Sequence, residues 1–278
     1  MRIPRDKLIV CADDFGISPG VNQAIIEAHT KGVLTHASLL ANGAYLEDAV
    51  KLSSEMAPSL KLGLHINLTG GKPVLPSKKI PGLVNEDGDF KYGSVTLLFK
   101  VILKPFLLLE IREEIEAQIN KLQKMGVHIF HMDGHHHVQM IPGIFKIVEK
   151  FADKYKIPRI RVVNEDLNTT ILQTGSISFL KGGGLAKYAL LSTLCSLNKY
   201  KTRTYFFSIV NSCRIPPELI KNISIPKGFD SMEIMLHPGN PGIDKDFDTG
   251  NIDEYEHLTS EFRTLELQTA LELKKFIE

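Results

Sequence analysis

Cysteine is scarce in this sequence. Its three cysteines, Cys11, Cys195 and Cys213, are an odd number without close pair spacing. This pattern excludes a small scaffold stapled by disulfides, and it is typical of a reduced compartment, in which such cysteines are structural or incidental.

A dominant charge of one sign is missing too. The 33 Lys and Arg residues stand against 32 Asp and Glu residues, which leaves a formal charge of +1. No field of the whole molecule therefore favours nucleic acid or an anionic membrane. The expected partner is a small molecule.

Long apolar runs are absent as well. No stretch reaches the roughly 18 uncharged apolar residues that a spanning helix needs, so an integral membrane protein is not expected. Residues 1–6 are polar and lead straight into a strand-like stretch, without the apolar core of a secretion signal. We therefore expect a cytoplasmic protein.

Short apolar runs alternate with stretches of helical spacing through most of the 278 residues. Residues 8–12 are typical of a buried parallel strand, and Ser18-Pro19 begins a helix that continues past Ile25. Further strand-like runs lie at 37–41, 60–68, 127–132, 160–163 and 232–237. This alternation predicts an α/β fold, a mainly parallel sheet or (β/α) barrel, in a single domain over 1–278.

Two apolar segments, residues 94–109 and 181–201, interrupt the alternation. Both are rich in Leu and carry flanking Lys residues. One interpretation is packing onto the barrel or a homodimer contact. The other is a lid or a helix that contacts a membrane surface, because interfacial segments combine apolar and Lys residues in this way.

Polar side chains follow four of the expected strands. In parallel α/β folds the catalytic groups gather at the carboxyl ends of strands, where the loops converge. The four strand ends carry Asp13 and Asp14 in CADDFG, His65 in GLHINLTGGKP, the run HMDGHHHVQ from His131, and His237 in MLHPG. These positions are the candidates for metal binding and acid–base chemistry.

Asp13 and Asp14 are adjacent carboxylates. Two like charges this close raise one pKa unless a cation or donors compensate. One carboxylate could then ligate a metal while the other moves protons. The alternative is that one of them caps the next helix, but Ser18 is better placed for that role.

The histidines are more specific as a group than singly. His65 alone would more often be a hydrogen-bonded structural residue. The segment from His131 to His137, however, holds four imidazoles and Asp133 within seven residues. Neighbours on an extended chain diverge, so we expect His135, His136 and His137 to divide into one ligand, one substrate contact and one packing residue. His237 precedes a rigid Pro-Gly turn and either faces the site or faces water.

Together CADDFGIS, GLHINLTGGKP, HMDGHHHV and MLHPG resemble, in the same order, the motif set of the YdjC-like carbohydrate deacetylases, over roughly residues 7 to 240. The resemblance implies a distorted (β/α) barrel and one divalent cation, Mg²⁺ first and Zn²⁺ second. It implies Asp14, His65 and His135 as ligands and Asp13 as the base. His136, His137 and Arg161 are the corresponding candidates for substrate contacts.

This chain departs from the family pattern in two places. Gln139 stands where the family commonly has a histidine, and the closing segment that family members tend to have after the last helix is not evident before Glu278. We therefore expect an incompletely closed barrel. The two apolar segments and the phrase GKPVLPSKKIPGLVNEDGDF resemble the branch associated with hopanoid biosynthesis more than the chito-oligosaccharide branch.

The expected reaction is removal of an N-acetyl group from an acetylated amino sugar, either an oligosaccharide or a glycolipid. Asp13 would take the proton of the attacking water and His237 would protonate the departing amine. Arg159 and Arg161 would orient Asp13, bind sugar or form a solvated salt bridge. One Asp and two His are also the ligand set of the facial-triad iron oxygenases. Those enzymes would need an antiparallel β pattern, whereas this sequence alternates strands and helices. A non-catalytic sugar- or lipid-binding protein is the other alternative, and Asp13 beside Asp14 argues against it.

Overall fold

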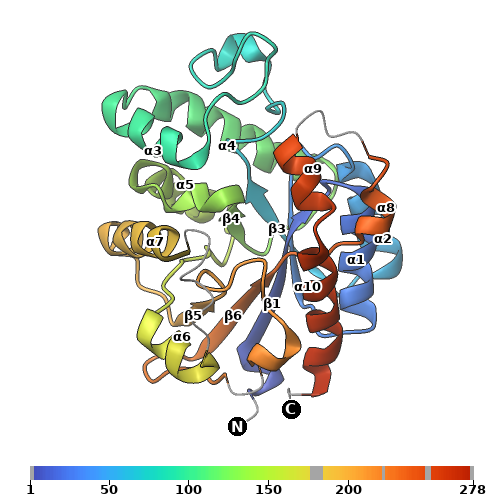
Figure 1. Cartoon of the computed structure of the whole chain (residues 1–278). Helices are drawn as coiled ribbons and strands as arrows, with labels where there is room; N and C mark the ends of the chain where they lie inside the picture. Colours follow the sequence, from blue (N-terminus) through green and yellow to red (C-terminus); the bar gives the residue numbers. More distant parts are fainter. Residues whose placement is uncertain (1–2, 176–183, 221–222, 248–251, 276–278) are drawn as a thin grey trace.

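The computed structural model describes residues 3–175, 184–220, 223–247 and 252–275. Six parallel strands form one curled sheet in the order β4-β3-β2-β1-β6-β5 (Figure 1). The strands are β1 (Leu8–Phe15), β2 (His36–Leu39), β3 (Lys61–Ile66), β4 (Met132–Gly134), β5 (Thr204–Phe207) and β6 (Ser231–Leu236). The predicted α/β fold with parallel strands is confirmed.

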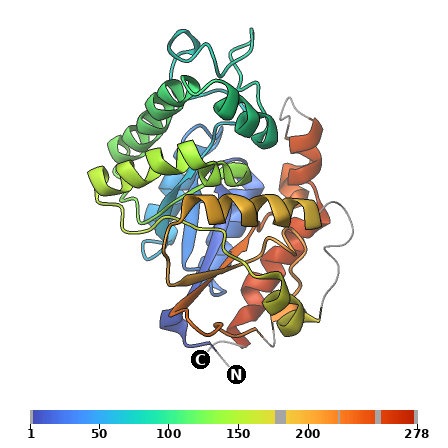
Figure 2. The same ribbon diagram turned by 90° about the vertical axis from the view of Figure 1, so that its left-hand side faces the viewer.

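Helices cover the sheet in two groups. Helices α1, α2, α8 and α10 lie together on one side, and α4, α5 and α7 lie together on the other (Figures 1 and 2). The helices are α1 (Pro19–Thr30), α2 (Leu46–Met56), α3 (Ser94–Leu103), α4 (Leu107–Lys124), α5 (Pro142–Tyr155), α6 (Leu167–Thr174), α7 (Gly184–Asn198), α8 (Pro241–Asp244), α9 (Ile252–Leu258) and α10 (Glu261–Glu272). Among the described helices, none combines the length and apolar character needed to cross a bilayer.

The first βα unit shows why the chain changes direction after β1. Nearly all of β1 is buried, as its apolar sequence predicts. The Ser18 side chain then accepts from the Val21 amide at 3.2 Å and Pro19 occupies the first turn of α1. Ser18 is thus the helix cap, which leaves Asp13 and Asp14 free of that role.

The sheet does not close fully into a barrel, as predicted. Beyond β4 a single parallel bridge joins Met132 to Ile160. The remaining gap to β5 is spanned by the side chain of Asn164, which donates to the Thr204 carbonyl (3.0 Å) and accepts from the Phe206 amide (2.7 Å). The predicted strand at 160–163 is therefore only a bridge, and β5 was missed from the sequence.

The two apolar segments become helices beside the site. Residues 94–109 form α3 and the first turn of α4, and the second segment forms α7, while 181–183 lie outside the described residues. Both α3 and α7 contact the short 3-10 helix η3 (His135–Met140). Both segments therefore lie next to the run His135–His137.

Candidate metal centre and active site

Asp14, His65 and His135 meet at the carboxyl ends of β1, β3 and β4. Asp14 Oδ1 lies 3.0 Å from His135 Nδ1 and 3.5 Å from His65 Nε2. One donor atom from each residue falls within 4.8 Å of the others, and all three side chains are buried or nearly so. One carboxylate oxygen and two imidazole nitrogens suit a divalent cation and leave coordination positions open.

A break in the sheet register turns both adjacent carboxylates toward this end. Pairing of β1 with β2 shifts between Ala12 and Phe15, and Asp14 adopts a left-handed φ of 67°. Bulges of this kind re-aim side chains and are frequent beside active sites. Asp13 and Asp14 can therefore serve the same site although they are neighbours in a strand.

Asp13 is fixed by a bidentate ion pair. Arg161 Nη1 and Nη2 donate to its two carboxylate oxygens at 2.7 and 2.8 Å. The same guanidinium contacts Asp133 Oδ2 (2.9 Å) and Glu233 Oε1 (2.7 Å), and its side chain is 0% exposed. A substrate contact by Arg161 does not fit this placement. The geometry favours the other predicted role, orientation of Asp13.

Arg159, the second predicted arginine, pairs with the far oxygen of Glu233. Burial alone would raise the pKa of Glu233, but Arg159 and Arg161 lower it below its usual range. Glu233 thus stays ionised and holds Arg161 from the side opposite Asp13.

Asp133 sets the orientation of His65. His65 Nδ1 lies 2.7 Å from Asp133 Oδ1, so Nε2 is the nitrogen directed to Asp14. Burial alone would lower the pKa of His65, but the charges of Asp13 and Asp133 and its hydrogen bonds raise that pKa to about 10. A bound cation would take the place of this proton.

Asp133 belongs to a buried network of hydrogen bonds with Ser38 and His131. Ser38 Oγ donates to Asp133 Oδ2 at 2.6 Å and lies 2.9 Å from His131 Nε2. His131 is fully buried and also lies 3.5 Å from Cys11 Sγ. A Cβ at Gly63 would sit 2.3 Å from the His131 ring, so glycine is needed there. Cys11, His131 and Asp133 also form a donor cluster of metal-binding size.

The three consecutive histidines have three different surroundings. His135 contacts Asp14, His136 is exposed with Nδ1 3.1 Å from Thr69 Oγ1, and His137 is buried with its ring against Phe206. Left-handed φ values of 53° and 57° at His136 and His137 separate the side chains. The three imidazoles thus have three different environments, and their division into ligand, substrate contact and packing residue stays a prediction. The placement offers His136 to substrate but leaves His137 little surface for that predicted contact.

His237 ends β6 in a polar corner. Its Nδ1 lies 3.3 Å from Glu266 Oε2 and 3.7 Å from Cys213 Sγ. Burial alone would lower the pKa of His237, but Cys213 and Glu266 raise it well above its usual range. The His237 ring lies 6.0 Å from that of His257, which in turn reaches to within 3.8 Å of Asp14 Oδ2.

Sequence reasoning missed the residues that α9 and α10 contribute. Arg263 Nη2 donates to Asp14 Oδ2 at 2.8 Å, and His257 and Glu266 complete the corner around His237. A Cβ at Gly239 would lie 2.7 Å from Arg263 Cδ, so the Pro-Gly turn after His237 makes room for this arginine. The available signal was the polar spacing of this helix, in which three of the four buried positions are Arg263, Glu266 and Thr269 and the fourth is Ala270.

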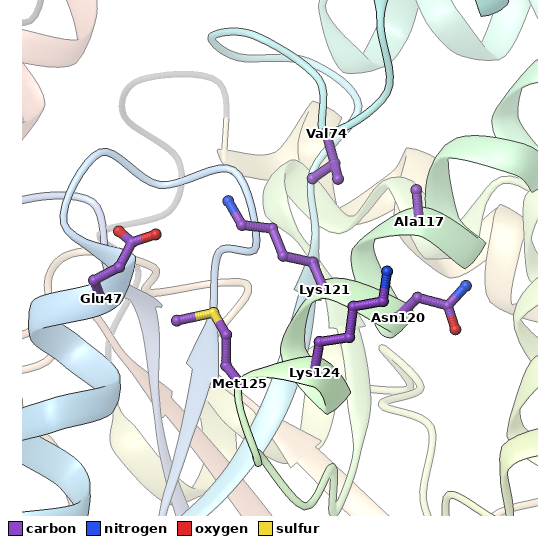
Figure 3. Close-up of a pocket in the computed structure, with 7 residues that line it drawn as sticks. All are labelled: Glu47, Val74, Ala117, Asn120, Lys121, Lys124 and Met125. Carbon is purple, nitrogen blue, oxygen red and sulfur yellow. The ribbon is translucent and has the colours of Figure 1, made fainter.

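A surface hollow lies elsewhere on the molecule. It encloses about 550 Å³ between α2 and α4 and is lined by Glu47, Val74, Ala117, Asn120, Lys121, Lys124 and Met125 (Figure 3). None of these residues belongs to the Asp, His and Arg cluster, and the hollow is wide open to solvent. Chemistry and burial therefore identify the site better than volume does.

The chain matches the family model described as YdjC-like protein over residues 7–274. It belongs to the YdjC-like family. The resemblance seen in the four motifs is thereby confirmed.

Two similar proteins are named as deacetylases, and a similar solved structure carries a different description. A carbohydrate deacetylase of Brevibacillus brevis is 43% identical over 55% of this chain, and the match covers only 58% of that protein. A chitooligosaccharide deacetylase of Salmonella typhimurium is 33% identical over 83% of this chain and 81% of its own. A solved structure from Enterococcus faecalis, provisionally described as a cellobiose-phosphate cleavage protein, is 27% identical with a TM-score of 0.61, covering 97% and 95% of the two chains.

Proposed function

We propose that this chain is a metal-dependent N-deacetylase that releases acetate from an acetylated amino sugar, carried on an oligosaccharide or a glycolipid. The observation that carries the proposal is the meeting of Asp14, His65 and His135 beside an arginine-oriented Asp13. The names of the YdjC-like relatives support the same reaction class. Assignment to the hopanoid-associated branch stays a prediction.

The three ligand candidates fit a divalent cation in charge, donor type and burial. Held by Asp14, His65 and His135, the cation, Mg²⁺ first and Zn²⁺ second, would polarise the acetamide carbonyl and acidify water. Asp133 and Arg263 would hold His65 and Asp14 in place from behind.

The chain's own groups supply the proton transfers. Asp13 accepts a proton from the attacking water as its oxygen bonds to the acetamide carbon. His237, whose raised pKa keeps it protonated at neutral pH, donates a proton to nitrogen as the carbon–nitrogen bond breaks. Acetate and a free amine are the products, and exposed His136 is the candidate contact to the sugar.

The test is incubation of the protein with a panel of acetylated amino sugars, chito-oligosaccharides and glycolipids, with Mg²⁺, Zn²⁺ or Mn²⁺ added. Mass spectrometry should detect acetyl loss from at least one substrate, and none after chelation. Asp13→Asn protein serves as the control for contaminating activity. Binding of a sugar without acetate release under any metal would instead identify the non-catalytic binding protein.

A further inference from the structure

Six large apolar side chains lie on the outer surface of α3 and the start of α4. Their exposed fractions run from 52% for Val95 to 75% for Leu103. We name this set the α3–α4 ridge: Val95, Phe99, Ile102, Leu103, Phe106 and Leu109. Single exposed apolar residues are ordinary, but six within 95–109 form a concentrated patch, which marks an interaction surface.

Helix α3 is apolar on both of its faces. Leu97, Leu98 and Val101 are buried against the rest of the protein, while Phe99 and Ile102 point outward at 58% and 65% exposure. A surface helix of a soluble protein normally pairs one apolar face with a polar one. The ridge therefore presents a second apolar face that the described part of the chain leaves exposed.

Lysines are the charged residues of the segment that carries the ridge. Residues 90–109 contain Lys91, Lys100 and Lys104 and no Asp or Glu, and the acidic residues Asp89 and Glu110 flank this segment. Apolar side chains flanked by lysines are the composition of segments that lie in a membrane interface, where lysine meets anionic headgroups.

A second copy of the chain fits this surface less well. A two-fold contact would place the same patch on both sides and gather the lysines of both copies at one contact. That arrangement brings like charges together around an apolar centre. An anionic bilayer complements both the apolar and the charged part of the ridge.

The ridge stands beside the candidate site. Helix α3 contacts η3, which carries His135, His136 and His137. Figure 1 shows α3 and α4 at the end of the molecule toward which β3 and β4 run, and Figure 2 shows the same end from the side. A surface held against the ridge would therefore lie close to the mouth of the site.

We propose that the α3–α4 ridge docks this protein on an anionic membrane surface as a peripheral contact. The docking itself is independent of the reaction. Only its consequence, access to an acetylated amino sugar attached to a lipid, rests on the proposed function.

The experiment is co-sedimentation of the full chain with vesicles of phosphatidylcholine, alone or mixed with phosphatidylglycerol, without any sugar substrate. Wild-type protein should bind the anionic vesicles, and salt should weaken the binding. The triple variant Phe99→Ser/Ile102→Ser/Leu103→Ser and the charge variant Lys100→Glu/Lys104→Glu should each bind at least about tenfold more weakly. The matched control Leu172→Ser/Leu197→Ser removes exposed leucines from α6 and α7 and should bind like the wild type.

Circular dichroism and thermal melting establish that each variant is folded, and the charge variant keeps the test decisive should the triple variant unfold. Wild-type protein that ignores anionic vesicles, or ridge and control variants that bind equally, would overturn the proposal. So would a lipid-free dimer that the ridge variants dissociate, which would assign the ridge to self-association. Because no substrate is present, these outcomes are separate from success or failure of deacetylation.

Discussion

Arg263 Nη2 and Asp14 Oδ2 are hydrogen-bonded at 2.8 Å although 249 residues separate them along the chain. The arginine engages one carboxylate oxygen and leaves the other, Oδ1, to His65 and His135. Helix α10 thus takes part in orienting a residue of the first strand. Burial alone would raise the pKa of Asp14, but its hydrogen bonds to the histidines and the charge of Arg263 hold it well below its usual range.

Replacing Arg263 by Gln should destabilise the cation-free protein by about 3 kcal/mol, because a buried carboxylate loses its fixed counter-charge. Divalent cation supplies that charge, so saturating metal should recover part of the loss. Urea unfolding with and without chelator measures both effects. Arg203→Gln, which removes an exposed ion pair with Asp230, is the control and should change little. Equal effects of the two substitutions would contradict the role of Arg263.

Metal content should separate the three consecutive histidines. His135→Ala should lose the cation, because His135 is the member of the run that contacts Asp14. His136→Ala and His137→Ala should retain it. Elemental analysis after dialysis against a limiting metal concentration checks this. Full occupancy in His135→Ala with loss in either neighbour would show that the ligand was assigned to the wrong histidine.

Asp13→Asn should keep the fold and the cation but lose about 10²- to 10⁴-fold in turnover, as removal of a general base typically does. An asparagine can still accept one hydrogen bond from Arg161, and the ion pairs of this buried arginine with Asp133 and Glu233 remain. Steady-state kinetics and metal content are measured on the same preparation. Near-normal turnover would exclude Asp13 as the general base. Loss of metal would show that Asp13, and not Asp14, is the ligand.

Glu266→Gln should move the alkaline limb of the pH profile of kcat/KM to lower pH. The Glu266 carboxylate helps to raise the pKa of His237, so its neutral replacement lowers that pKa, and the protonated acid is then lost at lower pH. A profile that keeps its alkaline limb while the rate falls uniformly would indicate a structural role for Glu266 instead.

His36 should make stability fall in mild acid. Burial and the nearby charges of His131 and Arg159 lower its pKa to about 2, whereas an unfolded histidine protonates near its ordinary value of 6.5. Below pH 6.5 the unfolded state therefore binds more protons, and this group subtracts at most about 1.4 kcal/mol per pH unit. Urea unfolding between pH 7.5 and 5 should show a shallower loss for His36→Asn than for the wild type. Parallel curves would contradict this.

The sequence could predict the position of the candidate site because three of its residues end parallel strands of one sheet. Asp14, His65 and His135 each follow an apolar run, and parallel strands bring their carboxyl ends together. It could not separate His135 from His136 and His137, since that depends on two left-handed backbone conformations. It could not name Arg263 or Glu266 either, because only the packing of α10 against β6 brings them to the site.

The strand β5 was missed for a different reason. Its four residues, Thr204–Phe207, are too few to show a period and follow a polar stretch. The predicted strand at 160–163 has the right composition but lacks a full partner, because the curled sheet leaves a gap there that side-chain hydrogen bonds of Asn164 and its neighbours span. A segment with the composition of a strand can therefore remain largely unpaired in the folded sheet.

Asn164 joins the sheet edge at β5 to the segment that follows Ile160 through its side chain. Its carboxamide offers one donor and one acceptor, as a peptide group does, so a single side chain replaces a rung of the ladder between 160–164 and β5. The next two residues continue the connection: the Asp166 backbone and the Tyr205 hydroxyl are hydrogen-bonded, and the Glu165 carboxylate accepts from the backbone amides of residues 208–210. Protection of the Phe206 amide against hydrogen exchange therefore depends on the side chain of Asn164, which accepts its hydrogen bond.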